Sequence, residues 1–172
     1  MRNKIFKIKN EEEFKEISLE LFEYQMEYNP IYYSYASHIL KGKSPNNISE
    51  IPFLPISFFK SNQIICKGRA VEEVFLSSGT QGDRSRHIVS ERSIYIDACM
   101  NAFEIFYGDI TKYCILSLLP SYRERKDSSL IYMIDDFIKK SKHQLSGFYL
   151  HDYKGLSKTI TALEKVGQKT IL

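Results

Sequence analysis

The sequence predicts an α/β fold in which N-terminal helices precede βαβαβ units that form a mostly parallel sheet. Apolar residues recur at helical spacing in the first forty residues, and short apolar runs alternate with helical patterns after residue 70. The last residues form another apolar run of strand type. With 172 residues, 43% hydrophobic and 26% charged, the chain has the size and composition of one ordinary globular domain.

Residues 1–69 are expected to form a helical cap and a connector. Apolar residues in steps of three and four predict an amphipathic helix over residues 11–28, which Asn29-Pro30 ends. A second helix is expected over residues 31–40, closed by Gly42. The prolines of "SPNNISEIPFLPISFFK" exclude a regular helix or a central strand there, so we expect an ordered connector whose apolar side chains lie against a core.

Residues 70–172 are expected to form the α/β part. Strand and helix signals alternate along it, with Ser90 as a candidate N-cap and Gly108 and Gly167 as helix ends. Successive segments read as strand, helix, strand, helix, strand, helix and strand: "AVEEVFLSS", "SERSIYIDACMNAFEIFYG", "YCILSLL", "KDSSLIYMIDDFIKKS", "SGFYLHD", "YKGLSKTITALEKVG" and "KTIL". A parallel strand in last position predicts a sheet that is incomplete at the C-terminus, and therefore a piece of a longer protein.

Composition excludes several classes of function. No apolar run approaches the roughly 18 residues of a membrane span, and no secretory signal precedes the first helix, so a cytoplasmic protein is expected. A net charge of +3 with intermixed signs does not indicate a nucleic-acid partner. No metal-ligand spacing is present, so no metal site is predicted, and His38, His143 and His151 are expected to be structural or exposed. The three cysteines are odd in number and widely spaced, so all are expected to be reduced. Cys99 and Cys114 are expected to be small buried hydrophobes, and Cys66, beside Lys67 and Arg69, has a low-pKa thiolate as its less favoured alternative.

One loop concentrates residue types that suit an anion. It is "FLSSGTQGDRSRH", residues 75–87, and it follows an expected strand. Its two glycines allow close backbone approach to a phosphate, its hydroxyls and backbone N–H groups are donors, and its arginines carry positive charge. The spacing matches neither the nucleotide P-loop nor the dinucleotide fingerprint. Glycine spacing alone therefore favours a plain turn over a phosphate site.

The residue identities in this loop add a resemblance. "SSGTQG" resembles the Ser-Ser-Gly-Thr-Thr-Gly phosphate loop of the adenylate-forming superfamily, which includes the acyl-CoA and phenylacetate-CoA ligases. Gln81 stands where the second Thr is usual, and the usual Pro-Lys ending is absent. Three further blocks, "IPFLPISFFK", "LLPSYRERKDSSLIYMID" and "SGFYLHD", are similar in content and order to the acyl-protein synthetase family. The resemblance covers most of residues 51–172.

The resemblance implies an ATP- and Mg²⁺-dependent ligase. In that family a fatty or other carboxylic acid is activated as an acyl-adenylate, and the acyl group then passes to a thiol; whether a protein or coenzyme A carries that thiol here stays open. The family's adenine- and ribose-binding motifs and its acyl-accepting cysteine have no counterpart here, so no catalytic residue is assigned and the chain alone is expected to be inactive without a C-terminal half or oligomeric partner. The residues implied in phosphate binding are Ser77, Ser78, Gly79, Thr80, Gln81, Gly82, Arg84 and Arg86.

A second basic loop, residues 121–129, follows another expected strand. It reads equally well as a solvated connection and as a second wall of an anion or acyl-adenylate site. In the second case Ser121, Tyr122 and Arg125 line a substrate pocket, and His87 is a further candidate for which simple surface exposure is the favoured alternative. The alternative to an enzyme is a binding or scaffold domain that has kept the fold and lost the chemistry.

Overall fold

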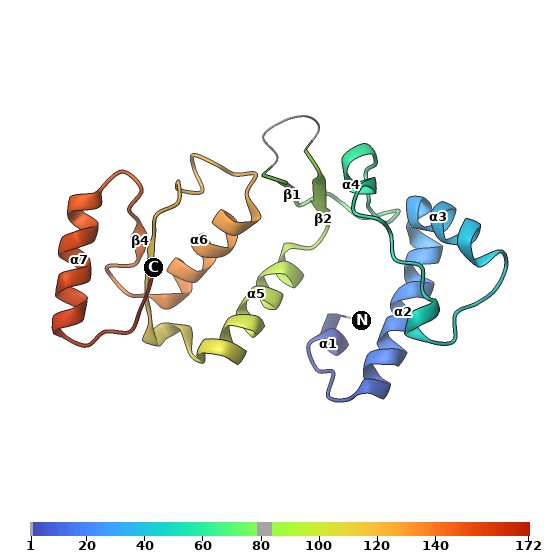
Figure 1. The fold of residues 1–172 in the computed structure, drawn as a ribbon, viewed down its shortest axis with the longest axis horizontal. Helices are drawn as coiled ribbons and strands as arrows, with labels where there is room; N and C mark the ends of the chain where they lie inside the picture. The colour runs from blue at the N-terminus through green and yellow to red at the C-terminus, as the bar shows by residue number, and fades with distance from the viewer. Residues whose placement is uncertain (1, 79–83) are drawn as a thin grey trace. The chain divides into compact units, whose positions relative to one another are not determined.

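The computed structural model describes residues 2–78 and 84–172. The chain folds into two compact units, Met1–Ile94 and Tyr95–Leu172, and each is described by itself. The first unit contains the helices α1 (Arg2–Ile5), α2 (Glu11–Tyr28), α3 (Pro30–Leu40) and α4 (Phe58–Ser61), the 3-10 turn η1 (Ile48–Glu50), and the strands β1 (Glu73–Leu76) and β2 (Arg86–Val89) (Figure 1).

Polar caps fix the ends of α2 and α3. Asn10 accepts a hydrogen bond from the Glu13 backbone N–H at 2.9 Å, and three glutamates in the first turn complement the positive end of the helix. Buried Asn29 ends α2 and begins α3, because its Oδ1 accepts from the Tyr32 N–H at 3.1 Å. Pro30 occupies the first helical position, where a missing N–H costs nothing. The two predicted helices are thus confirmed.

The connector is ordered, as the prolines predict. The hydroxyl of buried Tyr32 donates to the carbonyl of Pro52 at 2.8 Å, which ties the connector to α3. Further along, the Lys67 N–H donates to the Tyr28 carbonyl at 2.7 Å, at the end of α2. These long-range bonds hold residues 44–70 against the helices with little regular structure of their own.

The strand expected at the start of the α/β part exists, but its partner was not predicted. β1 pairs in antiparallel register with β2, with Glu73 opposite Val89 and Leu76 opposite Arg86. The assumption that the glycine loop follows a strand of the parallel sheet is therefore wrong for the described chain. β2 was not predicted because it is only four residues long and lacks an apolar run. It begins with Arg86 and His87, which are exposed in this two-stranded ribbon.

The second unit holds the predicted parallel sheet. Its strands lie in the order β4-β3-β5, and β3 pairs in parallel with both neighbours. α7 lies on one side of the strands, and α5 and α6 lie on the other (Figure 1). The elements from the end of the first unit onward are α5 (Arg92–Tyr107), η2 (Ile110–Lys112), β3 (Cys114–Ser117), α6 (Ser129–Ser141), β4 (Gly147–Phe148), α7 (Tyr153–Lys165) and β5 (Thr170–Ile171).

Two apolar clusters form the core of the second unit, and one of them includes β3. All four residues of β3 are buried, which is the pattern of a parallel strand with helices on both faces. Cys114 and Leu116 pack with Leu156 and Leu163 of α7. On the side of α5 and α6 the cluster is formed by the buried side chains of Phe103, Ile110 and Phe137. The mixed α/β class expected from the sequence is confirmed.

The start of α5 differs from the prediction. The helix begins at Arg92, and the Arg92 backbone N–H donates to the Glu72 carboxylate at 2.9 Å. This carboxylate satisfies an orphan donor and places negative charge near the positive helix end, the role expected of Ser90. Local sequence does not reveal such a cap, because Glu72 lies twenty residues away on the other side of the ribbon.

Candidate functional site

The base of the glycine loop is closed by one residue, Ser77, which follows β1. Its N–H donates to the Ser85 carbonyl at 3.0 Å, and its hydroxyl oxygen accepts from the Ser85 N–H at 3.0 Å. Its carbonyl accepts from Arg84 Nε at 2.6 Å. Ser77 therefore organises the loop base, and Arg84 extends back along the same loop. Gly79, Thr80, Gln81 and Gly82 lie outside the described residues.

Exposed polar groups flank the loop on both strands. Ser78 is exposed after β1, and Arg86 and His87 are exposed at the start of β2. The His87 ring meets Phe59 of α4 edge-on, with ring centroids 6.2 Å apart, so α4 supports this histidine. The hydroxyls and guanidinium groups of the described loop residues suit phosphate oxygens. They do not suit Mg²⁺, which prefers carboxylate, phosphate and water oxygens, so this ion would enter with a nucleotide.

The second candidate region lies in the second unit, where β3 and β4 end. The N–H and the Oγ of Ser121 both donate to Glu124 Oε2, at 2.7 and 2.6 Å. The Glu124 backbone N–H in turn donates a hydrogen bond to the Ser121 carbonyl at 3.0 Å. The other Glu124 oxygen lies 3.2 Å from His151 Nε2, in the loop after β4. The bonds from Ser121 are the largest cause that lowers the pKa of Glu124. Glu124 therefore joins the two loops at the carboxyl edge of the parallel sheet.

The other predicted pocket residues of this loop pack within the same unit. The Tyr122 ring lies edge-on to Tyr132 of α6, with centroids 5.5 Å apart. Arg125 Nε lies 3.4 Å from an Asp127 carboxylate oxygen. The structure thus brings Ser121, Tyr122 and Arg125 together in one ordered loop, while His87 belongs to the first unit.

Sequence reasoning missed Glu124 and His151. Both side chains are at least half exposed, and although each lies in a sequence block that resembles the acyl-protein synthetases, neither was singled out as a site residue. Their shared signal is position, because each follows a strand that the sequence assigns to the parallel sheet. Among the described residues no group of three or more His, Cys, Asp or Glu side chains is arranged to hold a metal ion.

The cysteines offer no activated thiol. Cys66, Cys99 and Cys114 are all free, and burial is the largest cause that raises the pKa of each. For Cys66 the raised pKa runs against the lowering that neighbouring Lys67 and Arg69 would suggest. A thiol with a raised pKa is mostly protonated at neutral pH and is a weak nucleophile.

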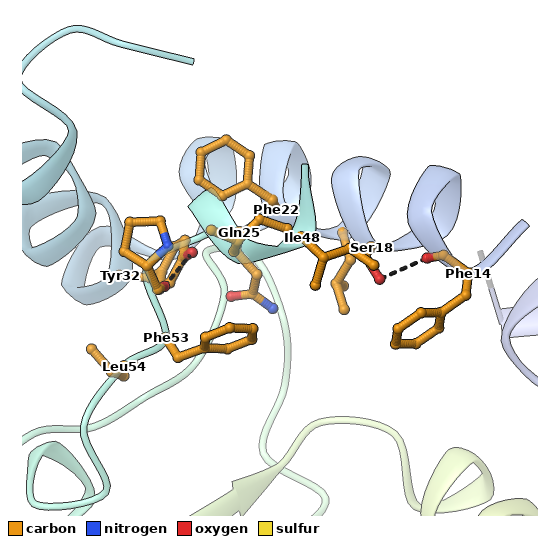
Figure 2. A pocket seen from close by; sticks show the side chains of 11 residues that line it. Phe14, Ser18, Phe22, Gln25, Tyr32, Ile48, Phe53 and Leu54 are labelled. Atoms are coloured by element: carbon orange, nitrogen blue, oxygen red, sulfur yellow. Dashed lines mark hydrogen bonds between the residues drawn. The ribbon is translucent and has the colours of Figure 1, made fainter. Parts of the chain in front are cut away.

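An apolar pocket that the sequence did not predict lies in the first unit. It opens between α2 and the connector and has a volume of about 220 Å³. Its walls include Phe14 and Phe22 of α2, together with Ile48 and Phe53 (Figure 2). Leu21 of α2 also lines it. None of these residues belongs to the glycine loop.

Within the described residues no helix is long and apolar enough to cross a membrane. The comparisons with known proteins found no family model, no curated protein and no solved structure that matches the chain. The likeness to the acyl-protein synthetases therefore rests on the sequence blocks alone.

Proposed function

We propose that this chain carries the phosphate-binding portion of an ATP-dependent, acyl-protein synthetase-like ligase. The ligase activates a fatty or other carboxylic acid as an acyl-adenylate and transfers the acyl group to a thiol on a protein or on coenzyme A. One observation carries the proposal: Ser77 closes the base of a loop whose sequence resembles a known phosphate loop, with exposed Ser78 and Arg86 on its two sides.

The described residues fit the first step of this reaction. A carboxylate oxygen bonds to the α-phosphorus of ATP, the bond between the α-phosphorus and the bridging oxygen breaks, and pyrophosphate leaves. Hydroxyl, backbone N–H and guanidinium donors around the loop suit the negative charge of the phosphates. Closure of the loop base by Ser77 keeps the two strand ends in place.

Thiol transfer is assigned to groups outside the described sites. The thiol sulfur attacks the acyl carbonyl and AMP leaves, so the accepting thiol must become a thiolate. The raised pKa values of Cys66, Cys99 and Cys114 make them poor acceptors. We therefore propose that the accepting thiol is external to these residues, in a C-terminal half, in an oligomeric partner, on an acceptor protein or on coenzyme A.

Calorimetry with ATP tests the phosphate loop. Saturable binding that requires Mg²⁺ is expected for the unaltered chain. Ser78→Ala, Arg86→Ala and the double variant Thr80→Ala with Gly82→Ala should each weaken it about tenfold or more, because each removes contacts to a charged group or the backbone freedom that they need. Ser157→Ala and Lys158→Ala on exposed positions of α7 are matched controls and should bind within about twofold of the unaltered chain.

Equal binding by loop and control variants, or no binding at all, would overturn the loop assignment. A binding or scaffold domain that has kept the fold and lost the chemistry is the second candidate. Reading the coding DNA past Leu172 separates the two. A frame that continues into a Gly-rich adenine-binding segment and a late Cys supports the ligase, whereas an immediate stop codon supports the scaffold.

A further inference from the structure

The apolar pocket of the first unit has the chemistry of a selective small-molecule site. Eleven residues of the described chain line it, and none of them is charged (Figure 2). A carboxylate, phosphate or ammonium group placed there would lose hydration without meeting a side chain of opposite charge. The walls therefore favour a neutral molecule, and the volume of about 220 Å³ limits its size.

The hydroxyl groups of the pocket already use their protons. Ser18 Oγ donates to the Phe14 carbonyl at 2.7 Å, one turn earlier in α2 (Figure 2). Tyr32 Oη donates to the Pro52 carbonyl at 2.8 Å. Each hydroxyl has a single proton, so neither one has a donor left for a ligand.

No residue in the described part of the chain accepts a hydrogen bond from the Gln25 side-chain nitrogen, so its donors are left for a ligand, and the structure fixes which end of the amide carries them. The Tyr32 backbone N–H can only donate, so the Asn29 atom that it meets at 3.1 Å must be the oxygen. The Asn29 nitrogen then donates to Gln25 Oε1 at 2.9 Å. This relay fixes Nε2 as the other end of the Gln25 amide, which projects from α2 into the pocket (Figure 2).

We propose that this pocket binds a neutral, mainly apolar small molecule that carries one carbonyl-type hydrogen-bond acceptor, which receives a hydrogen bond from Gln25 Nε2. About nine non-hydrogen atoms suit the space of about 220 Å³, since a cavity of about 150 Å³ holds benzene with its six. The site is separate from the glycine loop, and its assignment does not depend on the proposed ligase function. A neutral carbonyl compound is also chemically distinct from the carboxylate that the ligase would activate.

Three probes of equal size test each part of the proposal. Acetophenone is neutral with a carbonyl acceptor, cumene is neutral without an acceptor, and benzoate is charged. Each is titrated into the full ¹⁵N-labelled chain while the Gln25 side-chain amide and the backbone amides of residues 14–25, 48–51, 53 and 54 are followed by NMR. Acetophenone should produce saturable shifts with a Kd on the order of 1 mM or tighter. Cumene should bind about tenfold more weakly, and benzoate more weakly than cumene.

Two variants and one control test whether the probes bind in this pocket and whether Gln25 donates the hydrogen bond. Gln25→Glu keeps the oxygen that Asn29 needs but replaces the donating nitrogen, so the advantage of acetophenone over cumene should disappear. Gln144→Glu makes the same change at an exposed position of the second unit and should leave that advantage intact. Ser18→Leu fills the pocket and should abolish the binding of both neutral probes, with far-UV circular dichroism to verify helix content.

Three results with the probes would overturn the proposal: no saturable shift with any probe, benzoate binding as tightly as acetophenone, or an advantage of acetophenone that survives Gln25→Glu. Shifts at residues 14–25 that depend on protein concentration without a probe would assign the pocket to a second copy of the chain, and would also overturn it. None of these results depends on ATP, so failure here and failure of the phosphate loop are distinguishable.

Discussion

At the scale of single residues, three polar side chains hold together segments that the sequence treats as independent. Asn29 links two helices, Ser77 closes the base of the glycine loop, and Glu124 bridges the loops after β3 and β4. None of the three stands out by residue type. Their importance comes from the number of backbone and side-chain donors that reach each one.

The Glu124 carboxyl group should titrate below its ordinary range. Its pKa is lowered because Ser121 Oγ and N donate to the ionised form, with a smaller contribution from His151. A lowered folded-state pKa means that the contribution to stability is present above the unfolded pKa of about 4.3 and is lost as the pH falls through the folded value. Carbon-detected NMR titration of the chain measures this pKa directly.

Ser121→Ala is the matching variant. It removes the hydroxyl donor and should move the Glu124 pKa back toward its ordinary value. Ser157→Ala, on the exposed side of α7, should leave the Glu124 pKa unchanged. A Glu124 pKa that is identical in the Ser121→Ala variant and in the unaltered chain would contradict the assigned cause.

At the scale of elements, some helix ends can be predicted from the local sequence, whereas other helix and strand ends cannot. Asn10, Ser128 and Asp152 each cap the helix that follows them, and a side chain of this type before an amphipathic run is a local signal. The start of α5 depends instead on Glu72, and β1 depends on β2. These non-local partners explain why the ribbon and the true helix start were not predicted.

Asn29 makes a quantitative prediction at this scale. Asn29→Ala removes the cap of α3 and leaves Gln25 Oε1 without one of its donors, so it should lower the free energy of unfolding by about 1–3 kcal/mol. Asn47→Ala is the matched control, since Asn47 is exposed and its side chain makes no capping hydrogen bond to η1. The control should change the free energy by less than about 0.5 kcal/mol. Urea unfolding followed by circular dichroism measures both, and equal losses would contradict this account of Asn29.

At the scale of the whole molecule, the sequence predicted the α/β class and the parallel sheet of the second unit. The continuous apolar run of buried β3 and the amphipathic periodicity of α6 and α7 are strong local signals, because they reflect which faces meet the core. It did not predict the apolar pocket of the first unit or the Glu124–His151 contact. Both the pocket and this contact are formed by residues that are distant in sequence and come together only in the folded chain. A periodic sequence pattern does not predict such contacts.

The proposed ligase function also belongs to the whole molecule, and its central claim is that the loop after β1 binds polyphosphate. The most direct measurement is an NMR titration of the ¹⁵N-labelled chain with MgATP, followed at every assigned backbone amide. The account predicts saturable shifts concentrated in residues 77–87, and the same shifts with magnesium tripolyphosphate, because the phosphates supply the contacts. An unchanged spectrum at residues 77–87, or saturable shifts only in the loop at residues 121–129, would contradict it.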